Sequence, residues 1–278
     1  MPTPQGGTDG TLPGRMHILG VRVDVIDLPR ATSLLSRWAE EGGPHSVFVR
    51  DAPSLMLISR DEPLQRLHEH ASLVVPDGTP LVWIGRLRGF GGEIGRVAGA
   101  DLVDAVCAAS LETGRTHFFY GGKPGVAGEM AHRLEARYPG LRVAGVHSPP
   151  MRAFDPAASF DTDGLAELDL IRKSGADFVW VGISSPKQEA WISRAAPRIG
   201  QGVFLGVGAA FDFHSGTIRR APPWMRDHGL EWLHRLASEP GRLWRRYLLL
   251  APQFLMAAAA EEMGRAIRRI RAKAPTGK

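Results

Sequence analysis

The chain alternates short apolar segments with amphipathic ones over most of its length, and this alternation is the feature that most limits its fold. Residues 176–183 and 202–208 are short, apolar and rich in β-branched and aromatic side chains, which is typical of buried strands. Longer segments between such runs carry apolar residues at helical spacing. Strands that alternate with helices favour an α/β fold with a Rossmann-like, mainly parallel sheet and flanking helices. Ligands bind such a sheet at the carboxyl ends of its strands.

The expected elements make up a lead and a core. The Pro-, Gly- and Thr-rich lead at residues 1–14 is expected to be disordered. Residues 15–214 are expected to form the Rossmann-like catalytic core, which opens with a small β element. We expect strands at residues 16–26, 45–50, 73–76, 116–120, 141–147, 176–183 and 202–208. We expect helices at residues 29–41, 53–70, 79–87, 99–113, 126–138, 164–173 and 186–196.

Residues 215–278 differ from the core in pattern and charge. Three helical segments are expected there, at residues 222–237, 240–250 and 252–271. This part holds 13 Lys and Arg against 5 Asp and Glu, a net charge of +8 in a chain whose total is +5. Its longest apolar run, residues 247–260, is shorter than the ~20 residues that a membrane-spanning helix needs. We therefore expect a basic helical appendage that lies on an anionic membrane surface without crossing the membrane.

Cysteine usage and the N-terminal residues indicate a compartment. Cys107 is the only cysteine, which excludes an internal disulfide and a Cys-based zinc site. No stretch near Met1 combines the charged, apolar and cleavage parts of a secretory signal. We expect a cytoplasmic protein that is peripheral on the inner face of the cell membrane.

Residues 206–246 hold more charge and more aromatic side chains than folding alone requires. Seven arginines and three tryptophans lie in this one stretch. Apart from Asp212, the only local counter-charges are Asp227, Glu231 and Glu239, so most of the arginines must find anions elsewhere. Guanidinium groups pair bidentately with phosphate oxygens, which makes a phosphate-bearing ligand the natural partner.

Two acids lie where an open sheet would bind a ligand. Asp77 and Gly78 directly follow the expected strand at residues 73–76. A plain Asp-Gly turn accounts for the pair. The alternative is a general base, because a carboxylate beside a substrate hydroxyl takes its proton as the oxygen attacks. Asp212 is similarly open to two interpretations, a buried acid paired with an arginine or an acceptor for ribose hydroxyls.

A glycine-rich loop at residues 121–125 joins an expected strand to an expected helix. Gly122 and Lys123 are therefore candidates to hold a phosphate or nucleotide at a helix N-terminus. The loop is neither a Walker A loop nor G-x-G-x-x-G, and strand-to-helix glycine turns are common without ligands.

The segment 184–189 also joins a strand to a helix. Ser185 is expected to cap this helix and Pro186 to begin it. That cap leaves Lys187 and Gln188 unexplained, and an ammonium group and an amide suit sugar hydroxyls or a diphosphate.

Three patterns that suggest a nucleotide or metal site fail on their context. The residues at 206–208 begin like a dinucleotide fingerprint, but no third glycine follows and no helix is expected there, which argues against NAD. The D-x-D pattern at 161–163 precedes a helix, where Asp is the ordinary N-cap. His68 and His70 lie two residues apart on a helix and point away from each other. We expect no metal site and no cofactor.

Several segments together carry a resemblance to a known family. They are VVPDGTPLVWIGRLRG (74–89), RVAGADL (96–102), FFYGGKPGVAGEMAHRLEARYPGL (118–141), GISSPKQEAWI (182–192) and the stretch 206–246. In this order, over roughly residues 45–255, the chain resembles the WecG/TagA/CpsF glycosyltransferases, glycosyltransferase family 26. The resemblance implies an inverting, metal-independent transfer of a hexose or N-acetylhexosamine, of the N-acetylmannosamine type, in cell-surface polysaccharide synthesis. The implied donor is a UDP-sugar, and the implied acceptor is a saccharide linked to polyprenyl diphosphate.

The resemblance also implies roles for individual residues. Asp77 takes the place of the proposed base, and Arg96 takes that of a nearby active-site arginine. Gln188 matches a substrate-contacting glutamine, and Asp212 lies where the nucleotide is held. The arginines that would close over the diphosphates are Arg235, Arg242 and Arg245.

The chain departs from the family pattern after the second strand, where Val49-Arg50-Asp51 stands in place of Thr-x-Asn. Asp51 therefore takes the position of a sugar or acceptor contact, which implies a different donor sugar or reduced activity. One alternative is a catalytically silent, sugar-nucleotide-binding scaffold of a polysaccharide assembly complex. Nucleic acid is not expected as a partner, because the basic residues alternate with a long apolar run and not with stacking aromatics. The oligomeric state stays open, a homo-oligomer included.

Overall fold

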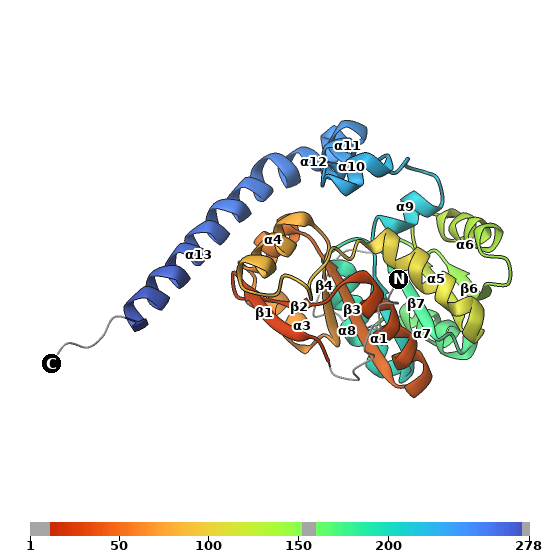
Figure 1. Ribbon diagram of the computed structural model, residues 1–278. Helices are drawn as coiled ribbons and strands as arrows, with labels where there is room; N and C mark the ends of the chain where they lie inside the picture. Colours follow the sequence, from red (N-terminus) through yellow and green to blue (C-terminus); the bar gives the residue numbers. More distant parts are fainter. Residues whose placement is uncertain (1–11, 152–159, 274–278) are drawn as a thin grey trace, which may run out of the picture.

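A six-stranded sheet in which every pairing is parallel forms the centre of the molecule (Figure 1). The computed structural model describes residues 12–151 and 160–273, so most of the predicted lead lies outside the described residues. The sheet has the order β4-β3-β8-β7-β5-β6. Its strands are β3 (Pro44–Arg50), β4 (Leu73–Pro76), β5 (Thr116–Gly121), β6 (Arg142–His147), β7 (Phe178–Gly182) and β8 (Gly202–Gly206). The predicted Rossmann-like α/β fold is confirmed.

Helices cover both faces of this sheet, which is why its strands are continuous apolar runs and not alternating ones. One face packs against α1 (Leu28–Glu41), α5 (Gly99–Thr113), α6 (Val126–Arg137) and α9 (Ala210–His214). The other packs against α7 (Thr162–Ser174) and α8 (Lys187–Ile199).

The short helix α9 corrects the expectation that no helix follows β8. Phe211 in α9 lies fully buried, and a Cβ added at Gly182 would lie only 2.3 Å from its ring. Tertiary packing of this ring onto the end of β7 holds the helix in place, and no local signal announces it.

Two further predictions at the N-terminal end were wrong in detail. The single strand expected at residues 16–26 is an antiparallel hairpin of β1 (Gly14–Ile18) and β2 (Val21–Val25), because Leu19 and Gly20 turn the chain with φ of 52° and 77°. The helix expected at 53–70 is split into α2 (Ala52–Ile58) and α3 (Glu62–His70). Asp61 caps α3 by accepting a hydrogen bond from the Leu64 N–H at 3.0 Å.

The hairpin does not join the main sheet by strand pairing but builds a third apolar cluster beside it. This cluster combines the hairpin with α2, α4 (Thr79–Leu87) and the long C-terminal helix α13 (Ala251–Lys273). Phe254 of α13 is 0% exposed within it. The C-terminal helix α13 therefore covers part of this third apolar cluster.

The appendage crosses above the carboxyl ends of the strands, and α13, which packs against α2, then runs down to the lower left (Figure 1). Its other helical segments are α10 (Pro223–Asp227), α11 (Glu231–Ser238), α12 (Pro240–Trp244) and the π-helical turn η1 (Arg245–Leu250). The helix expected at 222–237 is thus broken, because Gly229 adopts a φ of 71°. Within the described ranges, no helix is long and apolar enough to cross a membrane.

Candidate active site

The carboxyl ends of four strands and four helical segments of the appendage line a cavity of about 590 Å³. Its core side is made by the residues that follow β3, β4, β7 and β8, which lie together because parallel strands end at one edge of the sheet. Its appendage side is made by α11, α12, η1 and the start of α13. Six of the candidate residues line it: Asp51, Asp77, Arg96, Gln188, Arg235 and Arg242.

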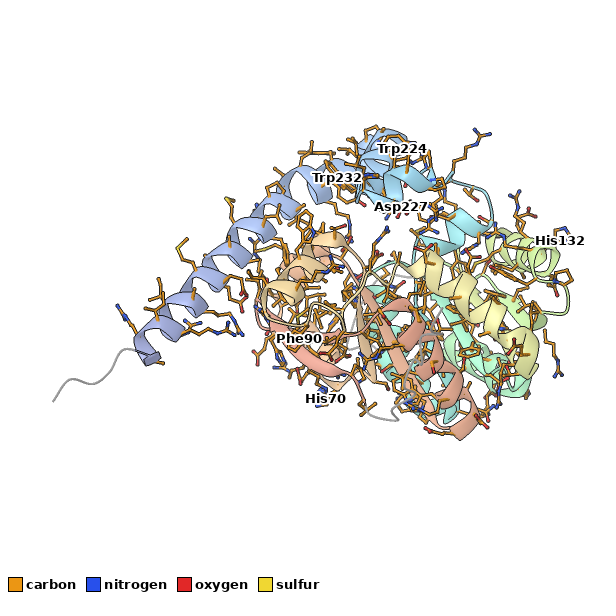
Figure 2. The ribbon with its side chains drawn as sticks, viewed as in Figure 1. His70, Phe90, His132, Trp224, Asp227 and Trp232 are labelled. Atoms are coloured by element: carbon orange, nitrogen blue, oxygen red, sulfur yellow. The ribbon has the colours of Figure 1, made fainter. Side chains whose placement is uncertain are left out.

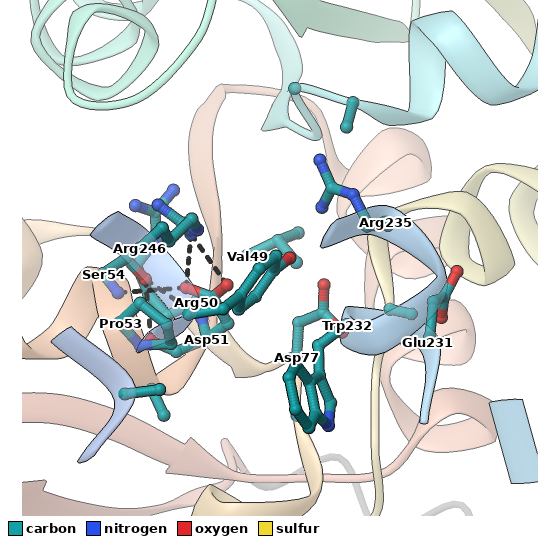
Figure 3. A pocket seen from close by; sticks show the side chains of 18 of the residues that line it. Val49, Arg50, Asp51, Pro53, Ser54, Asp77, Glu231, Trp232, Arg235 and Arg246 are labelled. Carbon is teal, nitrogen blue, oxygen red and sulfur yellow. Dashed lines mark hydrogen bonds and ion pairs between the residues drawn. The ribbon is translucent and has the colours of Figure 1, made fainter. Parts of the chain in front are cut away.

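Asp77 lies in the middle of this cavity, as Figure 3 shows, with Asp51 on one side and Arg235 and Glu231 on the other. Its backbone N–H donates to the Arg50 carbonyl at 2.6 Å, which ties the end of β4 to the end of β3. Burial raises the pKa of Asp77 to about 6, Arg96 and Arg235 oppose this rise, and the charges of Asp51 and Glu231 add to it. With this pKa, the carboxyl group is mostly ionised at neutral pH and binds a proton more readily than an ordinary carboxylate does.

A chain of ion pairs joins the core to the appendage at one side of the cavity. Arg96 contacts the Asp77 carboxylate at 3.4 Å and also donates to Glu231 of α11. Glu231 accepts at 3.1 Å from Arg220, whose guanidinium also donates to Asp101 of α5 at 2.6 Å. The paired guanidinium groups hold the pKa of Glu231 below its usual value, although burial alone would raise it. Glu231 is therefore a charged hub between the two parts.

A second ion pair closes the opposite side of the cavity. Arg246 of η1 donates to both carboxylate oxygens of Asp51, at 2.6 and 2.7 Å (Figure 3). Asp51 also caps α2, where it accepts from the Ser54 N–H at 3.0 Å. Burial would raise the pKa of Asp51, but Arg246 and Ser54 together lower it. Asp51 is thus a charged anchor for the appendage at neutral pH.

The three appendage arginines named from the family pattern lie in different surroundings. Arg235 points into the cavity, its guanidinium 5.5 Å from the Phe213 ring centre, and forms no ion pair with a described residue (Figure 3). Arg242 lines the cavity but pairs with Glu239 through two hydrogen bonds of 2.8 and 2.5 Å. Arg245 packs on Trp244 and does not line the cavity.

The segment before α8 differs from the expected cap. Ser185 does not cap the helix; its hydroxyl oxygen accepts from the buried Arg50 guanidinium at 2.9 Å. Gln188 is 3% exposed and lines the cavity. Lys187, the neighbouring residue, does not line it.

A further group of candidates lies outside the cavity lining, near the ends of β5 and β8. The Gly122 N–H donates to the Gly182 carbonyl at 3.0 Å, and its φ of 71° favours glycine. A Cβ added at this position would also lie only 2.7 Å from the Val126 side chain. Close packing therefore explains Gly122 without a ligand. Burial raises the pKa of Asp212, while Arg242, Arg235 and Lys123 favour its charged form.

The patterns set aside as metal sites have structural explanations. Asp161 caps α7 by accepting from the Gly164 N–H at 2.7 Å. His68 is buried, and burial together with nearby Arg50 lowers its pKa to about 3. His70 lies at the end of the molecule opposite Trp232, far from the appendage side of the cavity (Figure 2). Among residues 12–151 and 160–273, no three His, Cys, Asp or Glu side chains are grouped as metal ligands.

Sequence reasoning missed the residues that hold the site together. Glu231 was counted only as a local counter-charge, yet it pairs with two arginines, one of them in the core. Arg246, Arg220 and Arg226 were expected to find phosphate, but each contacts a core carboxylate, Asp51 or Asp101. No local signal identifies such partners, which lie 119–195 residues away for Arg220 and Arg246.

Loss of the charge on Glu231 tests the link between core and appendage. In Glu231→Gln, Arg96 and Arg220 lose their shared carboxylate, and we expect docking of the appendage to weaken by about 2 kcal/mol. Limited proteolysis between residues 215 and 230 should then accelerate. Asp227→Asn, which neutralises an exposed acid of the same segment (Figure 2), is the control and should leave the cleavage rate unchanged. Equal protection of both variants would contradict the link.

Comparison with known proteins agrees with this architecture. The family model described as "Glycosyl transferase WecG/TagA/CpsF family" matches residues 16–268. A relative from Bacillus spizizenii (strain ATCC 23059 / NRRL B-14472 / W23) bears the name N-acetylglucosaminyldiphosphoundecaprenol N-acetyl-beta-D-mannosaminyltransferase. It is 31% identical over 192 residues, which cover 69% of this chain and 70% of the relative. The chain therefore belongs to the WecG/TagA/CpsF family of glycosyltransferases, as its sequence resemblance predicted.

Proposed function

We propose that this glycosyltransferase moves an N-acetylhexosamine from a UDP-sugar to a saccharide linked to polyprenyl diphosphate, with inversion at the anomeric carbon. The observation that carries the proposal is Asp77, a carboxylate with a pKa of about 6 in a cavity lined by arginines. The name of the Bacillus spizizenii relative, which specifies an N-acetylmannosaminyl group and a diphosphoundecaprenol acceptor, supports the choice of substrates.

In this mechanism Asp77 is the general base. Its carboxylate takes the proton of the acceptor hydroxyl while that oxygen attacks the anomeric carbon from the face opposite UDP. The C–O bond to the acceptor forms as the bond to the UDP oxygen breaks, so the configuration inverts. Arg96, which contacts Asp77 at 3.4 Å, keeps the carboxyl group oriented and limits how far burial raises its pKa.

The negative charge of the leaving diphosphate would be taken up by guanidinium groups. Arg235 suits this role best, because it lies in the cavity without a carboxylate partner among the described residues. Arg242 can exchange Glu239 for a phosphate at the rim, where its side chain is 55% exposed. Asp212, Lys123 and Lys187 would face the nucleoside part of the donor beyond the cavity lining.

The Asp51–Arg246 pair supports an active enzyme over a silent scaffold. Asp51 replaces the family's asparagine, and the charge that this change introduces meets a guanidinium of the same chain at 2.6 Å. A degenerate site would leave such a charge unpaired in a half-buried position, at a cost in stability.

The end of α13 is proposed to rest on the membrane that carries the acceptor. Its last docked contacts are Glu261 and Glu262, which pair with Arg88. Beyond them the helix exposes apolar and basic side chains together, a composition that suits an anionic lipid surface. These residues are Met263, Arg265, Ile267, Arg268, Arg269, Ile270 and Arg271.

Asp77→Asn tests the proposed base. Transfer should fall at least about 100-fold, and the rise of wild-type kcat/KM through pH 6 should disappear, because the amide cannot accept the proton. UDP binding should persist. Undiminished transfer would disprove the role.

The stability of Asp77→Asn is a second test. Because the pKa of Asp77 is higher in the folded than in the unfolded state, its ionisation lowers wild-type stability as the pH rises through 4–6. The variant should therefore melt no lower than the wild type at pH 8.

Arg235→Ala tests the proposed diphosphate contact. We expect the Kd for UDP to rise about tenfold or more, because a guanidinium–phosphate pair in a water-poor site is lost. Arg235→Lys should restore part of the affinity. Arg219→Ala, at an exposed arginine outside the cavity, is the matched control for the change in net charge. If both alanine variants bind UDP like the wild type, Arg235 does not hold the diphosphate.

A chain that ends at Glu262 tests the membrane role of α13. The cut keeps Phe254 and the contacts to Arg88, so the fold should be retained. We expect loss of co-sedimentation with vesicles that contain anionic lipid, together with unchanged transfer to a short-chain, water-soluble acceptor. Full binding of the shortened chain to those vesicles would place the membrane contact elsewhere.

A further inference from the structure

A buried ion pair lies beneath the cavity, at the meeting point of β3, β7 and α8. Arg50 is 1% exposed and Glu189 is 0% exposed, and the Nη2 group of Arg50 donates to Oε1 of Glu189. The mechanism proposed above does not use either residue. Burying both charges is expensive and is weak evidence for added stability, so the pair calls for another explanation.

The pair determines the orientation of the Gln188 side chain. Gln188 Nε2 donates at 2.8 Å to the same Glu189 Oε1 that accepts from Arg50. A carboxylate only accepts hydrogen bonds, so the amide nitrogen must face it and the amide oxygen must face away. That oxygen is buried without a partner and lies against Gly208, which lines the cavity. Gln188 therefore offers an unused acceptor to whatever occupies the cavity.

The same guanidinium also orients the Ser185 hydroxyl, which it leaves with a free hydrogen-bond donor where Gln188 has a free acceptor. Arg50 Nη1 donates to Ser185 Oγ at 2.9 Å, and a guanidinium only donates. The hydroxyl hydrogen must then point elsewhere, and Ser185 is an exposed residue of the cavity lining. Through one arginine, the cavity thus presents a donor at Ser185 and an acceptor at Gln188.

We propose that Arg50 and Glu189 are positioning residues that make Ser185 and Gln188 a subsite for a ligand group with a hydrogen-bond donor beside an acceptor. An amide N–H next to its carbonyl has this pattern. In the UDP-N-acetylhexosamine of the proposed function, on which this inference rests, the acetamido group of the sugar and the imide edge of uracil both carry it. A buried acceptor strongly rejects ligands that cannot donate to it, so the subsite also selects.

The test replaces the ion pair by apolar residues in Arg50→Met/Glu189→Leu, a change that buried pairs often tolerate. Calorimetry compares UDP, UDP-glucose and UDP-N-acetylglucosamine as ligands. If the acetamido group occupies the subsite, the double variant should bind UDP-N-acetylglucosamine about tenfold more weakly than the wild type and the other two ligands equally well. If uracil occupies the subsite, the affinity for all three ligands should fall by the same factor. Ser185→Ala, at an exposed position, should weaken binding of the same ligands. It replaces the double variant in the test if the double variant does not fold.

Two further variants separate positioning from a general structural effect. Glu189→Gln keeps the oxygen that accepts from Arg50 and Gln188, and should stay within about threefold of wild type. In a Ser185→Ala/Gln188→Met background, the double substitution should weaken binding no further, because neither the hydroxyl nor the amide remains to be oriented. Asp24→Asn, in the other fully buried arginine–carboxylate pair, should lower the melting temperature but leave ligand affinities unchanged.

The outcomes distinguish this inference from the proposed function. Wild-type affinities in both the double variant and Ser185→Ala would overturn the subsite while leaving UDP-sugar binding intact. Additive losses in the Ser185→Ala/Gln188→Met background would overturn the positioning role. No binding of any of the three ligands by the wild type would overturn the proposed function and the subsite together.

Discussion

The site depends on one shared carboxylate, Glu231, held between an arginine of the core and an arginine of the appendage. Arg96 and Arg220 both donate to it, and neither pair is exposed enough for water to replace the interaction. Removing any partner would leave an uncompensated charge in a half-buried position, so the three groups stabilise one another. Docking of α11 against the sheet edge follows from this arrangement, and with it the enclosure of the cavity.

The same arrangement couples the position of the appendage to the chemistry of Asp77. Glu231 repels the Asp77 carboxylate and raises its pKa, while Arg96 and Arg235 lower it. Two of these groups, Glu231 and Arg235, belong to the appendage, so the balance changes if α11 moves away. The Asp77 carboxyl group thus reaches its full electrostatic environment only when the C-terminal part is docked. This dependence explains why one continuous chain carries both parts.

Several buried polar atoms without partners among the described residues lie around the cavity, while others, such as Nε2 of His68 and His117, lie in the core away from it. Those around the cavity include Arg50 Nε, Gln188 Oε1 and Glu189 Oε2 beneath it, and Arg235 Nε on the appendage side. Such atoms cost stability in the unliganded protein, and buried polar groups are normally satisfied. The position of these four beside the cavity indicates groups kept ready for a ligand, as expected where function takes precedence over stability.

Local patterns in the sequence were enough to predict the sheet, most helices and the position of Asp77, because strand, turn and helix signals follow one another around it. They were not enough for the pairs Arg50–Glu189 and Arg96–Glu231, whose members lie more than 100 residues apart. Ser185 shows the same limit, since its cap pattern is local but Arg50 takes its hydroxyl. The split at Asp61 was foreseeable from an N-cap followed by Pro63, and the longer apolar periodicity concealed it.

The most direct measurement is the titration of the Asp77 carboxyl group by carbon-13 NMR in the full chain, with its signal assigned by its absence from Asp77→Asn. A docked appendage over a buried acid predicts a pKa near 6, above the ordinary value of 3.8. A midpoint at or below 3.8 would show that the acid is solvated or dominated by its arginines, and would contradict the account of Asp77 as the base.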